Sequence, residues 1–379
     1  MGQTVKRVNN RSLASIALVG ALAVTLAGCG SDATTSSNGS TTAAEDGAEL
    51  SGSLAGAGAS SQEKAMEGWM ATFGSVAPGV TVSYEAVGSG GGREQFLAGG
   101  VQFAGSDAAL KDDELEAAVE RCYGGEAIEV PLYISPIAVV YNLPGVEVEN
   151  LNMSAPLIAN IFSGVVTNWN DPSIAAENEG VTLPDLAIVP VNRSDESGTT
   201  ENFTEYLAAA SNGAWTHEAS GDWPISGTQS GQGTSGVIDT VTGAEGAIGY
   251  ADASRAGDLG TVALRVGEEN VPFSAEAAAK VVDASPRAEG ATDKRLIVEL
   301  DRTTTEAGAY PLVLMSYSIA CSQYEDEAEA ANVKAFLSYI ASAEGQDVAS
   351  AADVAGSAPI SDSLRTEVQA AIDSISTVG

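Results

Sequence analysis

Short apolar segments alternate with amphipathic segments along the chain from about residue 50 onward. The predicted strands are residues 80–87, 128–141, 187–191, 247–250, 261–266 and 312–320. The predicted helices are residues 62–73, 93–98, 112–122, 201–210, 235–241, 328–341 and 361–375. Alternation of this kind is typical of an α/β fold in which helices cover the sheets.

One apolar run is longer than the others. Residues 129–142 are largely apolar and include Pro131 and Pro136. A chain of 379 residues is long enough for two domains of ordinary size. We therefore expect this run to be a strand that crosses from one domain to the other.

The N-terminus has the pattern of a secretion signal. A basic start is followed by the uncharged apolar residues 13–27 and then by Leu26-Ala27-Gly28-Cys29, which matches the lipobox of bacterial lipoproteins. We expect residues 1–28 to be a signal peptide and Cys29 to be acylated, because the apolar stretch is short for a membrane span. An uncleaved anchor and an ordinary signal peptide are the alternatives.

The segment that follows is small and polar. Residues 29–49 contain almost no large apolar side chain, so we expect a flexible tether between the lipid and a body that begins at Leu50. Cys122 and Cys321 then remain as an even pair in an exported protein, which favours a disulfide. Two separate buried thiols are the alternative.

Acidic residues outnumber basic ones, with 51 Asp and Glu against 17 Lys and Arg, for a net charge of −34. Nucleic acid and anionic lipid surfaces would be repelled by such a chain. A small anionic ligand is still allowed, because salt screens the net field beyond about 10 Å and local donors decide what a pocket binds.

Three glycine- and serine-rich segments each lie at the start of a predicted helix. They are residues 56–61, 88–92 and 193–200. Ser60 with Glu63 fits a capping box, which predicts that Ser60 is the N-cap of its helix.

The first turn of a helix has free N–H groups and the positive end of the helix dipole, so it attracts anions. Three such helix starts could surround a tetrahedral oxyanion with neutral donors. The alternative is that the segments are only helix caps. In that case Asp107 would be a turn residue and Arg193 with Asp195 a plain ion pair.

The order of these segments resembles that of the PstS-type phosphate-binding proteins of ABC transporters, from about Leu50 to the C-terminus. The matching motifs are GAGAS (56–60), GSGG (88–91), FAGSDAAL (103–110), R-x-D-x-SGT (193–199), a loop with WPI (223–225) and GAIGY (246–250). Ser89 and Asp107 are 18 positions apart, as in the family pattern.

The resemblance implies a set of phosphate ligands. Asp107 would accept a hydrogen bond from a protonated phosphate oxygen, and Arg193, paired with Asp195, would contact the anion. The other implied binding residues are Ser60, Ser61, Ser89, Ser197, Gly198 and Thr199, with Gly90 in support. Ser60 replaces the family's common threonine and Ser61 its common aromatic residue.

The implied fold is a type II periplasmic-binding-protein fold, with two α/β domains and a ligand cleft between them. Domain I would be residues 50–140 plus 250–379, and domain II residues 141–249. Cys122 and Cys321 would both lie in domain I. The implied partners are inorganic phosphate, the permease subunits of an ABC importer and, through the lipid anchor, the extracytoplasmic face of the membrane. We expect a monomer.

Catalytic motifs are missing from the sequence. His217 is the only histidine, and no Gly-x-Ser-x-Gly segment occurs, which argues against a histidine-assisted hydrolase. We expect no enzyme activity, no cofactor and no metal site. The alternatives are a receptor for sulfate, molybdate or another oxyanion, a phosphate-handling enzyme, and a surface adhesin.

Overall fold

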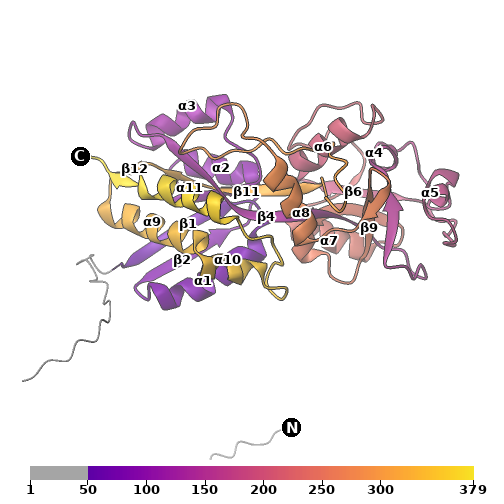
Figure 1. Cartoon of the computed structure of the whole chain (residues 1–379), viewed down its shortest axis with the longest axis horizontal. Coiled ribbons are helices and arrows are strands. Elements are labelled where there is room, and N and C mark those ends of the chain that lie inside the picture. The colour runs from indigo at the N-terminus through magenta and orange to yellow at the C-terminus, as the bar shows by residue number, and fades with distance from the viewer. Residues whose placement is uncertain (1–49) are drawn as a thin grey trace, which may run out of the picture. The chain divides into compact units, whose positions relative to one another are not determined.

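The computed structural model describes residues 50–379, which form one compact unit (Figure 1). The predicted signal peptide, the predicted acylation site Cys29 and the predicted tether lie outside these residues. Among the described helices, none has both the length and the apolar character that a membrane span requires.

An eleven-stranded sheet runs through the whole unit. Its main order is β2 (Val80–Glu85), β1 (Gly52–Gly58), β3 (Phe103–Ser106), β11 (Val313–Cys321), β4 (Ala127–Tyr141), β8 (Ala247–Asp252), β6 (Val189–Arg193) and β7 (Gln229–Gly231). Strand β9 (Gly260–Val266) also pairs with β4, and it joins β5 (Asn150–Met153) and β10 (Glu269–Val271) to the sheet. We call the strands β2, β1, β3 and β11 with their helices the β1 half, and the strands β5 to β10 with theirs the β8 half.

Strand β4 joins the two halves, and all of its 15 residues are buried. Its first part pairs with β11 and its last part, from Ile137, pairs with β8. Pro131, which has no N–H for the ladder, faces an irregularity in the pairing between Ser316 and Tyr317 of β11, the kind of place where a central strand tolerates proline. The predicted long strand is present and extends through both halves of the sheet.

Helices lie on both sides of the sheet (Figure 1). They are α1 (Glu63–Val76), α2 (Ser89–Leu97), α3 (Asp112–Arg121), α4 (Ala155–Phe162), α5 (Pro172–Glu177), α6 (Gly198–Ala210), α7 (Gly233–Gly243), α8 (Ala275–Ala284), α9 (Glu327–Ala341), α10 (Ala343–Ser350) and α11 (Asp362–Asp373). A short 3-10 turn, Ala253–Arg255, follows β8, and a two-stranded sheet pairs β12 (Gln323–Tyr324) with β13 (Ser376–Thr377).

The predicted α/β fold is confirmed, and each predicted strand and helix overlaps an observed one. Helix α2 begins at Ser89 rather than 93, and α6 at Gly198 rather than 201. A glycine run predicts a loop, yet α2 needs glycine because β1 passes so close. A methyl group on Gly92 would lie 2.3 Å from the Cα of Gly58.

The predicted disulfide is present. Cys122, after α3, is bonded to Cys321 at the end of β11, with an S–S distance of 2.03 Å and a sequence separation of 199 residues. Both residues are fully buried. The expected domain boundary at residue 250 falls inside β8, and the strands that follow it, β9 and β10, still pair within the β8 half.

Candidate functional site

The candidate site lies where strand ends of the two halves face each other. Strands β1 and β3 run parallel in one half, and β6 and β7 run parallel in the other. Strand β2 lies parallel to β1 in the first half. The carboxyl ends of β1, β2, β6 and β7 lead into the N-termini of helices α1, α2, α6 and α7. Crevices at the carboxyl ends of parallel strands are the usual ligand sites of open α/β sheets.

Asp107 follows β3 and occupies the centre of this region. It is 4% exposed. Its Oδ1 accepts hydrogen bonds from the hydroxyls of Ser61 and Ser316, both at 2.6 Å, and its Oδ2 accepts one from Thr199 at 2.9 Å. Ser61 and Ser316 belong to the β1 half and Thr199 to the β8 half, so this carboxylate connects the two halves. We call these four residues the Asp107 cluster.

Burial raises the pKa of Asp107 above its ordinary value, because a desolvated carboxylate is less stable than a neutral acid. The hydrogen bonds from Ser316, Ser61 and Thr199 and the charge of Arg193 oppose this effect in part. Asp107 is therefore a desolvated acceptor held by neutral donors.

The backbone of Asp107 is fixed as well. Its N–H donates to Ser89 Oγ at 3.1 Å, and its carbonyl accepts from Asn202 Nδ2 at 2.8 Å. Asn202 also donates to the carbonyl of Gly198 at 2.8 Å. A methyl group on Gly198 would lie 2.6 Å from Ser89 Oγ and 2.7 Å from the Cβ of Asp107, so only glycine lets α6 approach this closely.

Arg193 lies at the end of β6 and is 3% exposed. Its Nε and Nη2 donate to the two oxygens of Asp195 at 2.9 and 2.5 Å, a bidentate pair that fixes the guanidinium. Asp195 also accepts the N–H of Gly233, at the start of α7, at 3.0 Å. The remaining nitrogen of Arg193, Nη1, makes no hydrogen bond to residues 50–379.

Ser197 is the N-cap of α6. Its side chain accepts the N–H of Thr200 at 3.2 Å. The hydroxyl of Thr200 in turn lies 2.8 Å from the phenol oxygen of Tyr250, at the end of β8. The hydroxyl of Ser197 therefore caps a helix in this structure. This is the role that the capping alternative predicted for such segments.

The capping box predicted for Ser60 and Glu63 is wrong. Helix α1 begins at Glu63 with Gln62 as its N-cap, so Ser60 lies before the helix. Its Oγ instead accepts the N–H of Thr234, at the start of α7, at 2.9 Å. Ser60 Oγ was expected to accept the N–H of Glu63, in its own helix. The N–H of Thr234, from the β8 half, takes that place.

Thr234 and Ser316 were missed by the sequence analysis. Thr234 belongs to residues 231–236, GQGTSG, a fourth glycine-rich segment at a helix start, so the same pattern could have identified it. Ser316 lies within β11, where it also accepts a hydrogen bond from Gln62 at 2.6 Å. A serine inside a buried strand gives no comparable signal.

The structure brings the predicted binding residues together at one place. All eight are buried: Ser60, Ser61, Ser89, Asp107, Arg193, Ser197, Gly198 and Thr199. A groove of about 970 Å³ opens next to them, between α6 and residues 284–303, but Asp107 is the only one of the eight that lines it. Its rim includes Glu201, Glu205 and Asp301, an acidic lining unsuited to anions.

Comparisons with known proteins agree with this architecture. A PBP superfamily domain matches residues 35–344. A phosphate-binding protein from Mycobacterium bovis, PstS2, is 35% identical over 378 residues, covering 97% of this chain and 99% of that relative.

Two solved structures show the same fold at low sequence identity. The phosphate-binding protein from Stenotrophomonas maltophilia is 19% identical with a TM-score of 0.63, covering 84% of this chain and 93% of that one. A Clostridium perfringens protein, assigned as a phosphate ABC transporter substrate-binding protein and solved with bound phosphate, is 20% identical with a TM-score of 0.58, covering 82% of this chain and 100% of that one.

The identity to the mycobacterial relative extends over almost the whole of both chains, and the superfamily match covers most of this one. The relative is named as a binding protein, in line with the expectation that the chain is not an enzyme. On this evidence the chain belongs to the PstS phosphate-binding protein family.

Proposed function

We propose that this protein binds inorganic phosphate between its two halves and delivers it to the permease of an ABC importer. The observation that supports this most directly is Asp107, a desolvated carboxylate placed among neutral hydroxyl donors and beside one arginine. The names of the mycobacterial and Clostridium perfringens relatives describe the same function.

Asp107 would select phosphate by its proton. A carboxylate repels a fully ionised anion strongly in a desolvated pocket. Phosphate near neutral pH carries at least one proton, which it can donate to the Asp107 carboxylate. Sulfate carries none, so Asp107 would leave it with an unpaired repulsion.

The other proposed ligands supply donors with little net charge. The hydroxyls of Ser61 and Thr199 now donate to Asp107, and each can rotate toward a ligand. Arg193 supplies the one guanidinium, held in place by Asp195. Ser60, Ser89, Ser197 and Gly198 would add hydroxyls and helix N–H groups, with Gly90 leaving room at the start of α2.

Titration calorimetry with phosphate and sulfate tests this proposal. We expect the wild type to bind phosphate far more tightly than sulfate. In Asp107→Asn the amide offers a donor as well as an acceptor, so the preference for phosphate should fall by about tenfold to a hundredfold, the value of one hydrogen bond to a charged group. Asp113→Asn, on the exposed side of α3, is the matched control.

A wild type that binds sulfate as tightly as phosphate would refute the phosphate assignment. A general oxyanion receptor, for sulfate or molybdate as well, would then replace it. Release of phosphate from an aryl phosphate would instead support an enzyme, and the absence of any anion binding an adhesin.

We further propose how the protein is placed and how it moves. Residues 1–28 would be removed and Cys29 acylated, which anchors a monomer on the extracytoplasmic face of the membrane through the tether 29–49. The second moving unit would comprise about residues 141–249, as the sequence predicts, together with strands β9 and β10. Strand β9 pairs with β5 of that unit, and β10 pairs with β9.

A further inference from the structure

A buried arginine lies next to the candidate site, where it contacts Ser106, the residue before Asp107. Arg93, one turn after Ser89 in α2, is 1% exposed. Its Nε donates to both oxygens of Glu114 at 2.9 and 3.0 Å, and its Nη1 donates to Ser106 Oγ at 3.0 Å. Its Nη2 donates to Glu196 Oε1 at 3.0 Å. The first two partners belong to the β1 half, whereas Glu196 belongs to the β8 half.

Glu196 lies in the chain between Asp195 and Ser197, and its carboxylate fits a slot lined by glycine. A methyl group on Gly90 would lie 1.8 Å from Oε2, and one on Gly221 would lie 2.7 Å from Oε1. Gly90 is in the β1 half and Gly221 in the β8 half. The slot therefore has its full shape only when the halves are together.

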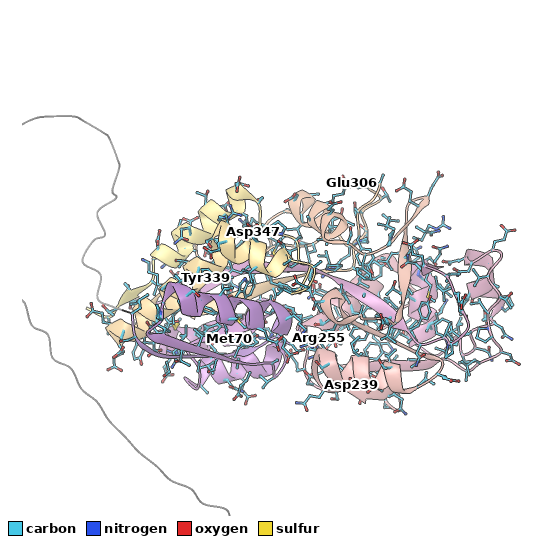
Figure 2. All side chains as sticks on the ribbon, turned by 90° about the horizontal axis from the view of Figure 1, so that it is seen from below. Met70, Asp239, Arg255, Glu306, Tyr339 and Asp347 are labelled. Atoms are coloured by element: carbon cyan, nitrogen blue, oxygen red, sulfur yellow. A yellow bond between two sulfur atoms is a disulfide. The ribbon has the colours of Figure 1, made fainter. Side chains whose placement is uncertain are left out.

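Other contacts also cross between the halves, but with more exposed charges. Arg255 pairs with Glu63 at 2.5 Å, with side chains 24% and 32% exposed. Figure 2 shows Arg255 at the junction between the helix that carries Met70 (α1) and the helix that carries Asp239 (α7). Glu196 is exposed to a similar degree, 25%, and the exposed Lys111 lies 3.6 Å from the same oxygen, but the Arg93 side chain is only 1% exposed. Solvent therefore screens the Arg93–Glu196 pair less than the Arg255–Glu63 pair.

We propose that Arg93 and Glu196 form a latch that holds the cleft closed and sets the rate at which the ligand leaves. Both are positioning residues, because neither is one of the proposed ligands. If the halves separate, Arg93 Nη2 loses its acceptor and Glu196 loses a buried cation. Arg93 keeps Glu114 as a partner, but its covered guanidinium loses one of two carboxylates. This loss is unfavourable, so the latch slows opening.

This latch rests on the proposed function, because the ligand whose release it slows is the phosphate that the protein is proposed to bind. The pair exists only while the halves are together, and it must break before a bound ligand can leave. It should therefore change the dissociation rate much more than the association rate, as is usual for contacts made late in binding.

Stopped-flow kinetics with inorganic phosphate on the full-length protein test the latch. Glu196→Gln keeps the shape and removes the charge, and we expect it to raise the dissociation rate about tenfold while the association rate changes less than about twofold. Gly221→Ala should have the same effect, because its methyl group would lie 2.7 Å from Glu196 Oε1 and would displace that carboxylate. Thermal unfolding of each variant separates this effect from a general loss of stability.

Glu367→Gln is the matched control. Glu367, in α11, pairs with Arg287 at 2.6 Å on the surface, with side chains 53% and 35% exposed, and α11 packs against α9 and β4. We expect its phosphate kinetics to equal those of the wild type.

The possible results separate the latch from the function. If the wild type binds phosphate and Glu196→Gln releases it at the wild-type rate, the latch is refuted and the function stands. If the wild type does not bind phosphate, the function fails, and small-angle scattering then decides the latch. A larger radius of gyration for Glu196→Gln than for the wild type would support the latch, and equal radii would overturn it.

Discussion

Asp252 is a buried acid that the proposed binding site does not use. It ends β8 and is fully buried. Its Oδ1 accepts hydrogen bonds from the hydroxyl of Tyr133 at 3.0 Å and from the N–H and hydroxyl of Ser254 at 3.0 and 2.5 Å. Its Oδ2 has no hydrogen-bond partner among residues 50–379. We predict that Asp252→Asn stabilises the protein at neutral pH.

The magnitude follows from the pKa. Burial raises the pKa of Asp252 from an ordinary 3.8 to about 6, despite the opposing hydrogen bonds. A folded-state pKa above the unfolded one means that stability falls as pH rises from about 4 to about 6 and is constant above that. About two pKa units correspond to about 3 kcal/mol of lost stability at pH 7 and above. Asparagine resembles the protonated acid in shape and charge, so it should recover this amount.

Urea unfolding of the wild type and Asp252→Asn between pH 4.5 and 8 measures the effect. The gain should be about 3 kcal/mol at pH 8 and should shrink toward zero near pH 4. Asp258→Asn, an exposed position in the next loop, should show no such dependence. A gain that is constant with pH, or a variant that is less stable at pH 8, would refute the reasoning.

Four further predictions concern the anchor, the disulfide, closure and charge. Cys29→Ser should move the protein from the membrane fraction to a soluble one, and unchanged membrane binding would contradict lipidation. Replacing Cys122 and Cys321 with serine should lower the free energy of unfolding by up to about 5 kcal/mol, given a loop of 199 residues, and equal urea midpoints would contradict this. The radius of gyration should decrease when phosphate is added, and an unchanged profile at saturation would contradict closure. The association rate for phosphate should rise with salt from about 0.01 to 0.15 M, because screening weakens the repulsion by a net charge of −34, whereas a falling rate would show local attraction at the cleft.

The alternation of apolar and amphipathic segments was enough to predict the fold class and the crossing strand β4. Strands β1 and β3 were not predicted because they are rich in glycine and alanine, residues more typical of loops than of strands. Their small residues are needed for close packing. A methyl group on Gly56 would lie 2.2 Å from the ring of Phe103, a tertiary contact that no local pattern shows.

The three glycine- and serine-rich helix starts predicted where the candidate site lies. They did not predict which contacts join the two halves there. A serine before a helix predicts a cap, whereas Ser60 accepts its hydrogen bond from Thr234, 174 positions away. The sequence pattern assigns no role to Glu196. Only the folded chain places it against Arg93, which is 103 positions distant.

Both ends of the described chain lie in the β1 half (Figure 1). Strand β1 begins at Gly52 against Val80, and β13 ends the chain beside β12. The consequence is mechanical. A force applied through either end pulls on the β1 half alone. The β8 half is carried along through the chain segments that join the halves, so the force puts no strain on the cleft. A fluorophore or a surface attachment at either end would therefore leave the opening and closing of the protein unhindered.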